Sequence, residues 1–255
     1  MFLFLVLAAL SPNVLCFLRS SGDMNYKFDT VASIPKIFYG TAWKKEHTAS
    51  LVAQAITSGF RAIDTACQPK HYSESGVGEG LKTLIKAGSV QRSDLFIQTK
   101  FTGLNGQDPN RIPYDKNAPI VDRVRQSFAV SLQNLHTDYL DSLMMHSPMD
   151  THEETLQVWR VFEEFHAQGK VHYLGISNIY SLESLKLIYD AANVKPTFIQ
   201  NRFYADSGHD TGIRSFCLEK GMKYQSFWTL TANNRVVKGY VQHMLCSVRT
   251  RTVLC

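Results

Sequence analysis

Short apolar, β-branched runs alternate strictly with amphipathic helical stretches along most of this chain, and no other feature restricts its fold as much. The runs that we predict as strands are residues 35–41, 60–65, 95–100, 139–145, 171–177, 196–202 and 223–228. The helices that we predict between them are residues 47–58, 76–87, 119–134, 153–168, 181–192 and 210–221. Strict alternation requires parallel strand pairing with right-handed crossovers. Seven such strands are too many for a small open sheet, so the pattern predicts an α/β barrel.

Glycines in two kinds of position support this interpretation. Gly59, Gly169 and Gly221 stand just past predicted helices, where a left-handed backbone conformation commonly ends a helix. The GVGEG run at 76–80 has a different meaning. A phosphate-binding glycine pattern would open the first strand-to-helix turn, whereas this run lies in the helix after the second strand. We therefore expect its small residues to allow close helix packing.

The two ends of the chain depart from the alternation. Residues 2–18 are almost entirely apolar, so residues 1–21 are predicted as a signal-like or targeting leader. With a genuine leader the protein would be secreted or organelle-targeted, and without one cytoplasmic; a buried strand or helix is the alternative for this segment. No acidic residue follows Glu219, and residues 233–255 are predicted as a basic tail. The barrel domain is expected over residues 34–232.

Charge and cysteine content argue against several function classes. The net charge is +5, but the six Lys and Arg residues after Glu219 exceed it, so the rest of the chain is nearly neutral. A neutral body with a basic tail is not typical of a nucleic-acid-binding domain. The five cysteines are odd in number and scattered, and the nine histidines lack ligand spacing. Neither a disulfide framework nor a metal site is predicted.

Polar and aromatic side chains stand at the C-terminal ends of the predicted strands. They are Thr41, Asp64, Lys100, His146, Ser177, Asn178, Gln200, Phe227 and Trp228. A polar group inside an apolar strand costs stability unless it is hydrogen-bonded, and one such group could be a satisfied core residue. Several at the same rim of a barrel indicate an active site, because that rim carries the working residues of such folds.

The residue types at this rim suit carbonyl reduction. This reaction needs a hydride donor, an acid that protonates the oxygen, and donors that polarise it. Tyrosine has a pKa of about 10 and needs a neighbouring positive charge to act near neutral pH. A lysine supplies that charge, a carboxylate orients the lysine, and a histidine can donate a hydrogen bond to the carbonyl.

Five sequence blocks resemble the aldo-keto reductase superfamily in order and spacing. They are RAIDTA (61–66), IQTK (97–100), MMHSP (144–148), GISN (175–178) and IQNRFY (199–204). The resemblance implies a (β/α)8 TIM-type barrel that binds a nicotinamide cofactor across its C-terminal mouth. It implies NADPH, with NADH as the alternative, and a small-molecule carbonyl substrate. No nucleic acid, and no membrane association beyond the leader, is expected, and the oligomeric state is open.

The resemblance also assigns roles to individual residues. Asp64, Lys100 and His146 match the family's catalytic aspartate, lysine and histidine. The cofactor positions that it implies are Thr41 near the nicotinamide ribose, Ser177, Asn178 and Gln200 at the carboxamide, and Phe227 stacked on the ring, with Trp228 as a rival.

The catalytic tyrosine departs from the family pattern. The family places it five residues after the aspartate, where this chain has Pro69. The next tyrosine is Tyr72, just before a predicted helix, and we take it as the acid. Tyr204 and Tyr114 are the alternatives. The neighbouring His71 is expected to face solvent, with a position pointing into the barrel mouth as the alternative.

The barrel is expected to be incomplete. A full barrel needs an eighth strand and helix after Trp228, but the remaining residues show no strand–helix alternation. We therefore predict about seven strands, with the eighth βα unit missing and with unpaired edges on the first and last strands.

Two functions from different classes are compatible with these features. The first is NADPH-dependent reduction of aldehydes and ketones to alcohols, with Tyr72 as general acid. The alternative is a catalytically impaired or inactive barrel remnant that acts as a binding or regulatory protein.

Overall fold

The computed structural model describes residues 5–8, 28 and 30–233. Seven parallel strands in chain order form most of a barrel. They are β2 (Ile37–Gly40), β3 (Ala62–Asp64), β4 (Phe96–Phe101), β5 (Leu140–Met145), β6 (Val171–Ser177), β7 (Phe198–Arg202) and β8 (Lys223–Phe227). All seven predicted strands are confirmed. The predicted α/β barrel is confirmed too, and among the described residues it has seven parallel strands and no eighth.

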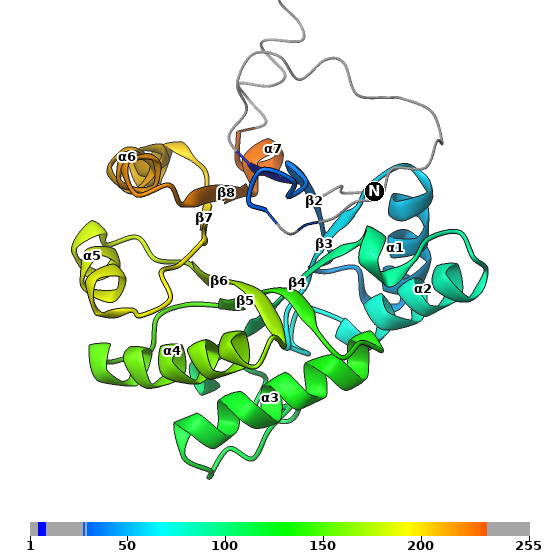
Figure 1. Ribbon diagram of the computed structural model, residues 1–255, viewed down its shortest axis with the longest axis horizontal. Coiled ribbons are helices and arrows are strands. Elements are labelled where there is room, and N and C mark those ends of the chain that lie inside the picture. The colour runs from blue at the N-terminus through cyan, green and yellow to red at the C-terminus, as the bar shows by residue number, and fades with distance from the viewer. Residues whose placement is uncertain (1–4, 9–27, 29, 234–255) are drawn as a thin grey trace, which may run out of the picture.

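Helices follow the strands and cover the outside of the sheet. They are α1 (Thr48–Thr57), α2 (Glu74–Lys86), α3 (Ile120–Leu135), α4 (His152–Ala167), α5 (Leu182–Ala191), α6 (Thr211–Glu219) and the short α7 (Thr229–Ala232). Short 3-10 turns occur at Lys45–His47, Arg92–Asp94, Leu104–Gly106 and Ala205–Asp210. The six predicted helices are confirmed as α1 to α6. They form an arc around the strands that is open beside α7 (Figure 1).

An additional strand, β1 (Leu5–Ala8), lies antiparallel between the first and last parallel strands. Its Leu7 pairs with Ile37 of β2 and with Ser226 of β8, so the ring of strands is closed. The expectation of unpaired edges is therefore wrong. Free backbone donors and acceptors at two sheet edges can pair with any extended segment within reach. The rest of the predicted leader and residues 234–255 of the predicted tail lie outside the described residues.

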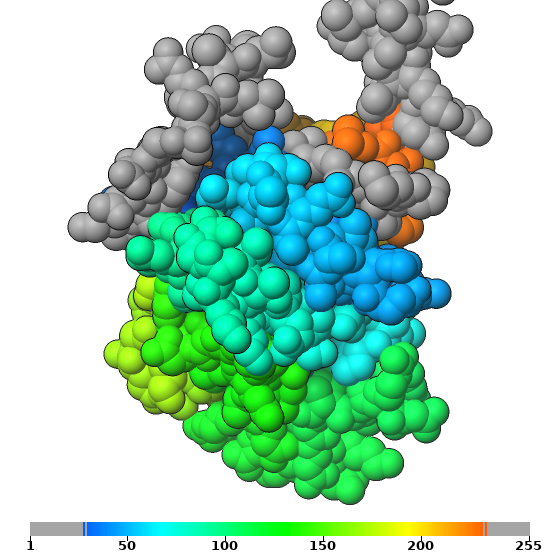
Figure 2. All heavy atoms as spheres, turned by 90° about the vertical axis from the view of Figure 1, so that its right-hand side faces the viewer, coloured from blue at the N-terminus to red at the C-terminus, as the bar shows by residue number. Residues whose placement is uncertain are grey.

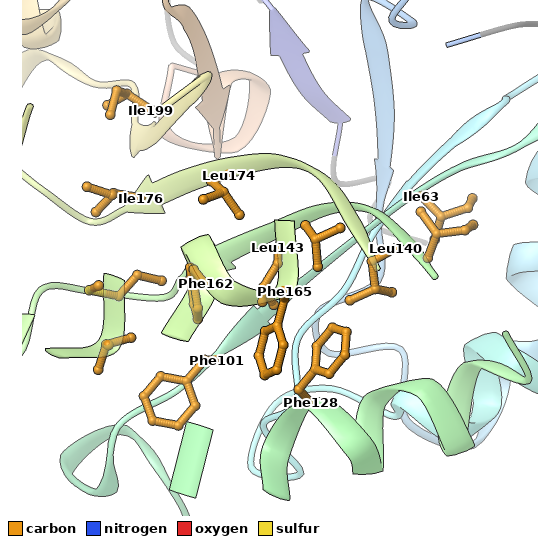
Figure 3. Close-up of a cluster of buried hydrophobic side chains, with 14 of the residues drawn as sticks. Ile63, Phe101, Phe128, Leu140, Leu143, Phe162, Phe165, Leu174, Ile176 and Ile199 are labelled. Atoms are coloured by element: carbon orange, nitrogen blue, oxygen red, sulfur yellow. The ribbon is translucent and has the colours of Figure 1, made fainter. Parts of the chain in front are cut away.

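Hydrophobic side chains fill the space between the sheet and the helices. Phe128 of α3 stacks on Phe165 of α4 with ring centroids 4.0 Å apart (Figure 3). Trp159 and Phe162 of α4 are fully buried in the same cluster. The outward faces of the strands, such as Ile63, complete this layer.

The opposite faces of the strands form a second, smaller cluster. Phe38, Phe96 and Phe198 pack edge to face, with centroids 5.4 to 6.3 Å apart. Side chains alternate between the two faces of a strand, so the residues two and four positions further on share this face. Gln98 and Lys100 thus follow Phe96 on β4 toward the C-terminal rim. The aromatic cluster therefore lies directly below the polar residues of the rim, toward the N-terminal ends of the strands.

Several glycines occupy positions that disfavour a larger residue, because of either a positive φ or a close neighbour. Gly59, Gly169 and Gly221 have φ of 101°, 70° and 70°, which confirms them as helix ends. A Cβ on Gly78 would collide with the carbonyl of Asn134 in α3, and one on Gly80 would lie 2.7 Å from the Ala49 carbonyl oxygen in α1. The run 76–80 therefore serves close helix packing, as predicted. Figure 2 shows the face of the molecule that α1 and α2 form together.

Candidate active site

A buried ion pair lies at the rim between β3 and β4. The Nζ of Lys100 donates to both carboxylate oxygens of Asp64, at 2.7 and 2.8 Å, and to the carbonyl of Thr65 at 2.9 Å. An ammonium has three donors, so all of them are used. Lys100 is only 1% exposed, and burial lowers its pKa while the charge of Asp64 opposes this shift. The pair is fixed because a buried charge without partners is costly.

Tyr72 lies beside this pair. Its ring centre is 5.4 Å from Lys100 Nζ, and its ring packs edge to face on that of His146, with centroids 5.9 Å apart. Burial raises the pKa of Tyr72, and the negative charge of Asp64 raises it further. The phenol therefore keeps its proton throughout the neutral range.

The two alternative tyrosines lie elsewhere. The hydroxyl of Tyr114 donates to the carbonyl of Thr102 at 2.8 Å, with its ring packed near Phe101. Tyr204 follows β7 and faces the Arg202 guanidinium at 5.4 Å. Neither lines the cavity that Tyr72 lines. Of the three candidates, Tyr72 is the one that the fold brings to the lysine, aspartate and histidine.

His146 follows β5, and both its backbone and its imidazole ring are hydrogen-bonded. Its backbone N–H donates to the carbonyl of Phe101 at 2.9 Å, and its Nδ1 lies 2.7 Å from the hydroxyl of Thr102. Burial lowers the pKa of His146 to about 3, and the positive charge of Lys100 contributes. The imidazole is thus neutral near pH 7, with one nitrogen that donates and one that accepts.

A cavity of about 350 Å³ opens over these residues. Seven of the predicted site residues line it, namely Asp64, Tyr72, His146, Ser177, Asn178, Gln200 and Phe227. Lys100 lies beneath it, in contact with Asp64. Thr41 is not among the lining residues, because its side chain is fully buried and its hydroxyl donates to the Asp64 carbonyl at 3.0 Å. Trp228, the rival of Phe227, also lines the cavity.

The three predicted carboxamide-binding residues are mutually bonded. Ser177 Oγ donates to the backbone carbonyl of Gln200 at 2.8 Å, and the amide of Asn178 donates to the His146 carbonyl at 2.9 Å. The Gln200 amide donates to Asp64 Oδ1 at 3.2 Å. The amide and hydroxyl groups of these three residues line the same cavity as the ring of Phe227, and such a set fits an aromatic amide such as nicotinamide.

Backbone strain is concentrated around the same cavity. Trp43, Asn178 and Trp228 have φ of 62°, 53° and 58°, and all three line it. Positive φ is uncommon for a bulky residue and costs about 1–3 kcal/mol. Such positions cluster at functional sites, where the surrounding structure holds them.

Sequence reasoning did not find several residues of the site. The Gln98 amide donates to Asp64 Oδ1 at 2.7 Å and to Gln225 Oε1 at 2.9 Å, which links β3, β4 and β8. Gln98 and Gln225 each stand in the middle of a predicted apolar strand, and this position was the available signal. Thr102 and Arg202 were also missed, although Arg202 ends the predicted strand 196–202 and its position at the rim was an available signal.

The expectation that His71 faces solvent is wrong. Its ring lies 4.0 Å from that of Trp43 and lines the cavity, and its Nδ1 is buried without a hydrogen-bond partner among the described residues. The alternative, in which His71 points into the barrel mouth, is the one that the structure shows.

The described part of the chain also bears on metals, membranes and disulfides. Within it, no three His, Cys, Asp or Glu residues are grouped as metal ligands would be. No helix of that part has the length and apolar character needed to cross a membrane. Cys67 and Cys217 are free and buried.

Known proteins are similar to this chain over most of its length. The chain is 29% identical over 176 residues to the uncharacterised oxidoreductase YtbE of Bacillus subtilis, covering 69% of this chain and 56% of the relative. It is 28% identical over 210 residues to glyoxal reductase of the same organism, covering 82% and 66%. The chain thus spans somewhat more than half to two thirds of the length of these relatives.

Solved structures match in the same way. An aldo/keto reductase from Brucella melitensis superposes with a TM-score of 0.58 at 26% identity, covering 73% of this chain and 65% of that one. The aldo-keto reductase AKR2E5, solved with NADPH, has a TM-score of 0.56 at 26% identity, covering 72% and 55%. The model of the aldo/keto reductase family matches residues 36–242. The chain therefore belongs to the aldo/keto reductase family.

Proposed function

We propose that this protein reduces aldehydes or ketones to alcohols with NADPH, with Tyr72 as the general acid. The observation that carries the proposal is the convergence of Tyr72, Lys100, Asp64 and His146 on one cavity. Family relatives named as a D-xylose reductase and a glyoxal reductase support the carbonyl substrate class. The structure of a relative that holds NADPH supports the cofactor.

The chain's residues divide the work as follows. NADPH supplies the hydride that is added to the carbonyl carbon. When NADPH is bound, Ser177, Asn178 and Gln200 would hold its carboxamide and Phe227 would lie against its nicotinamide ring. The neutral His146 donates a hydrogen bond to the carbonyl oxygen, which places the oxygen within reach of the Tyr72 hydroxyl.

The proton moves from the Tyr72 hydroxyl to the developing alkoxide. The Lys100 ammonium, held by Asp64, stabilises the phenolate that remains. Because the pKa of Tyr72 is raised, the resting phenol is fully protonated at neutral pH. The resting site is therefore in the protonation state that the role of general acid requires.

Tyr72→Phe tests the proposal, because it removes the acid and keeps the ring. We expect turnover to be abolished and NADPH binding to be retained. The quenching of tryptophan fluorescence measures the binding of NADPH. Tyr204→Phe is the matched control: it removes a hydroxyl outside the cavity and should retain turnover. Turnover in the Tyr72 variant at the wild-type rate contradicts the assignment.

The binding-only alternative predicts a different wild type. A barrel remnant without catalysis would bind NADPH saturably and turn over no aldehyde or ketone. Unpaired strand edges would give such a remnant a surface for binding a partner, but β1 pairs with both β2 and β8 and covers these edges.

A further inference from the structure

The catalytic cavity contains one charged side chain that the reaction described above does not use. Arg202 is the last residue of β7 and lines the cavity together with Tyr72 and His146. It follows Gln200 by two residues, so both side chains lie on the same face of the strand. Arg202 is thus about 6.6 Å further toward the rim than Gln200.

Aromatic rings hold the guanidinium in place. It lies 4.1 Å from the centre of the Trp228 ring, 5.4 Å from that of Tyr204 and 6.0 Å from that of Phe227. The backbone N–H of Arg202 donates to the hydroxyl of Tyr180 at 3.2 Å, which fixes the end of the strand. An arginine stacked in this way is pre-organised and loses little freedom when it binds a ligand.

The guanidinium has no anionic partner among the described residues. Their ion pairs do not include Arg202, and its Nε is buried without a hydrogen bond. The other charges at the cavity, on Lys100 and Asp64, neutralise each other at 2.7 Å. The cavity therefore carries one uncompensated positive charge, in a partly dry setting where a charge-assisted hydrogen bond is strong.

We propose that Arg202 binds an oxyanion, either a carboxylate or a phosphate oxygen, of a molecule in this cavity. This proposal rests on the proposed function, which identifies the molecules in the cavity as a carbonyl substrate and NADPH. A carboxylate would come from the substrate, which would then be an oxo-acid, and a phosphate from the cofactor. The planar guanidinium suits both, because it offers two parallel N–H donors to either group.

Equilibrium titrations of wild type, Arg202→Met and Arg202→Lys distinguish the two sources. The first probe is NADPH alone. The other two are succinic semialdehyde and butanal, each added in the presence of saturating NADP+. Binding of each probe is monitored by tryptophan fluorescence. The two aldehydes have equal chain length, but only the first carries a carboxylate. NADP+ cannot reduce them, so binding is measured without turnover. Arg214→Met is the matched control, since Arg214 stacks at 5.4 Å on Phe203 outside the cavity.

We expect Arg202→Met to weaken binding of the anionic probe about 10- to 100-fold, the effect of losing a charge-assisted hydrogen bond. Weaker succinic semialdehyde with unchanged butanal and NADPH assigns a substrate carboxylate. Weaker NADPH assigns a cofactor phosphate. Arg202→Lys should show a smaller loss of the same kind, and it provides the comparison if the Met variant does not fold.

The proposal is overturned if the Arg202 variants bind all three probes within twofold of wild type, or if wild type binds none of them. The proposed function fails separately. A wild type that binds NADPH and an aldehyde but turns over neither aldehyde contradicts reduction, and it leaves the assignment of Arg202 intact.

Discussion

The hydroxyl of Thr102 lies 2.7 Å from Nδ1 of His146 and is 3% exposed. A buried hydroxyl hydrogen needs an acceptor, and Nδ1 is the only partner of this hydroxyl among the described residues. Thr102 therefore donates to Nδ1, which leaves the ring proton on Nε2. This tautomer is the one that can donate from Nε2 to a carbonyl in the cavity.

Replacing Thr102 with Val tests this at the scale of one residue. The variant keeps the shape but lets Nδ1 carry the proton, so we expect kcat to fall about 10-fold. The Kd for NADPH should be unchanged, and nitrogen NMR of the imidazole should show a mixture of tautomers. Thr102→Ser keeps a hydroxyl and should recover most of the rate. Equal kcat for the Val variant and wild type contradicts the assignment.

At the scale of elements, Glu74 joins α2 to its neighbours. Its carboxylate accepts from the Thr99 hydroxyl of β4 at 2.6 Å and from the Asn134 amide of α3 at 3.0 Å. It is 5% exposed, and burial raises its pKa against these hydrogen bonds, which lower it. Because Glu74 begins the helix two residues after Tyr72, this junction also fixes the loop that carries the proposed acid.

Glu74→Ala should therefore lower the free energy of unfolding by about 2–3 kcal/mol, since it leaves the buried hydroxyl of Thr99 and the half-buried amide of Asn134 without their acceptor. Urea unfolding followed by circular dichroism measures the change. Glu79→Ala is the control on the same helix. Glu79 is exposed and pairs with His136 at 2.9 Å, so its loss should lower the stability far less than the loss of Glu74. Similar losses for both variants would show that the buried junction adds nothing.

The elements themselves could be predicted because their signals are local. Strand–helix alternation and helix-ending glycines act within a few residues, and every parallel strand and long helix follows them. The position of Tyr72 also followed from the sequence, since a strand end and a helix start bracket it. The Gln98–Gln225 bond could not be predicted, because it joins residues 127 positions apart. The partners of Thr102 and the stacking of Arg202 likewise depend on loops that only tertiary packing brings together.

At the scale of the whole molecule, β1 provides the pairing that closes the ring of strands. Leu7 pairs with both neighbouring strands, so proline at this position removes a backbone donor from the ladder. We expect Leu7→Pro to lower the unfolding temperature and to increase association measured by size-exclusion chromatography. Lys116→Pro is the control, because Lys116 is exposed and lies outside the strands. An unchanged unfolding temperature in Leu7→Pro would show that β1 adds no stability.

This closure also imposes an order of events during synthesis. The strand that completes the ring leaves the ribosome first, and one of its two partners, β8, is among the last strands to emerge. Contacts between distant parts of a chain form slowly, because the intervening loop must be closed first. Until β8 emerges, the growing sheet therefore has two open edges, one at β1 and one at the newest strand. A chaperone or a neighbouring nascent chain would meet those edges before β8 does.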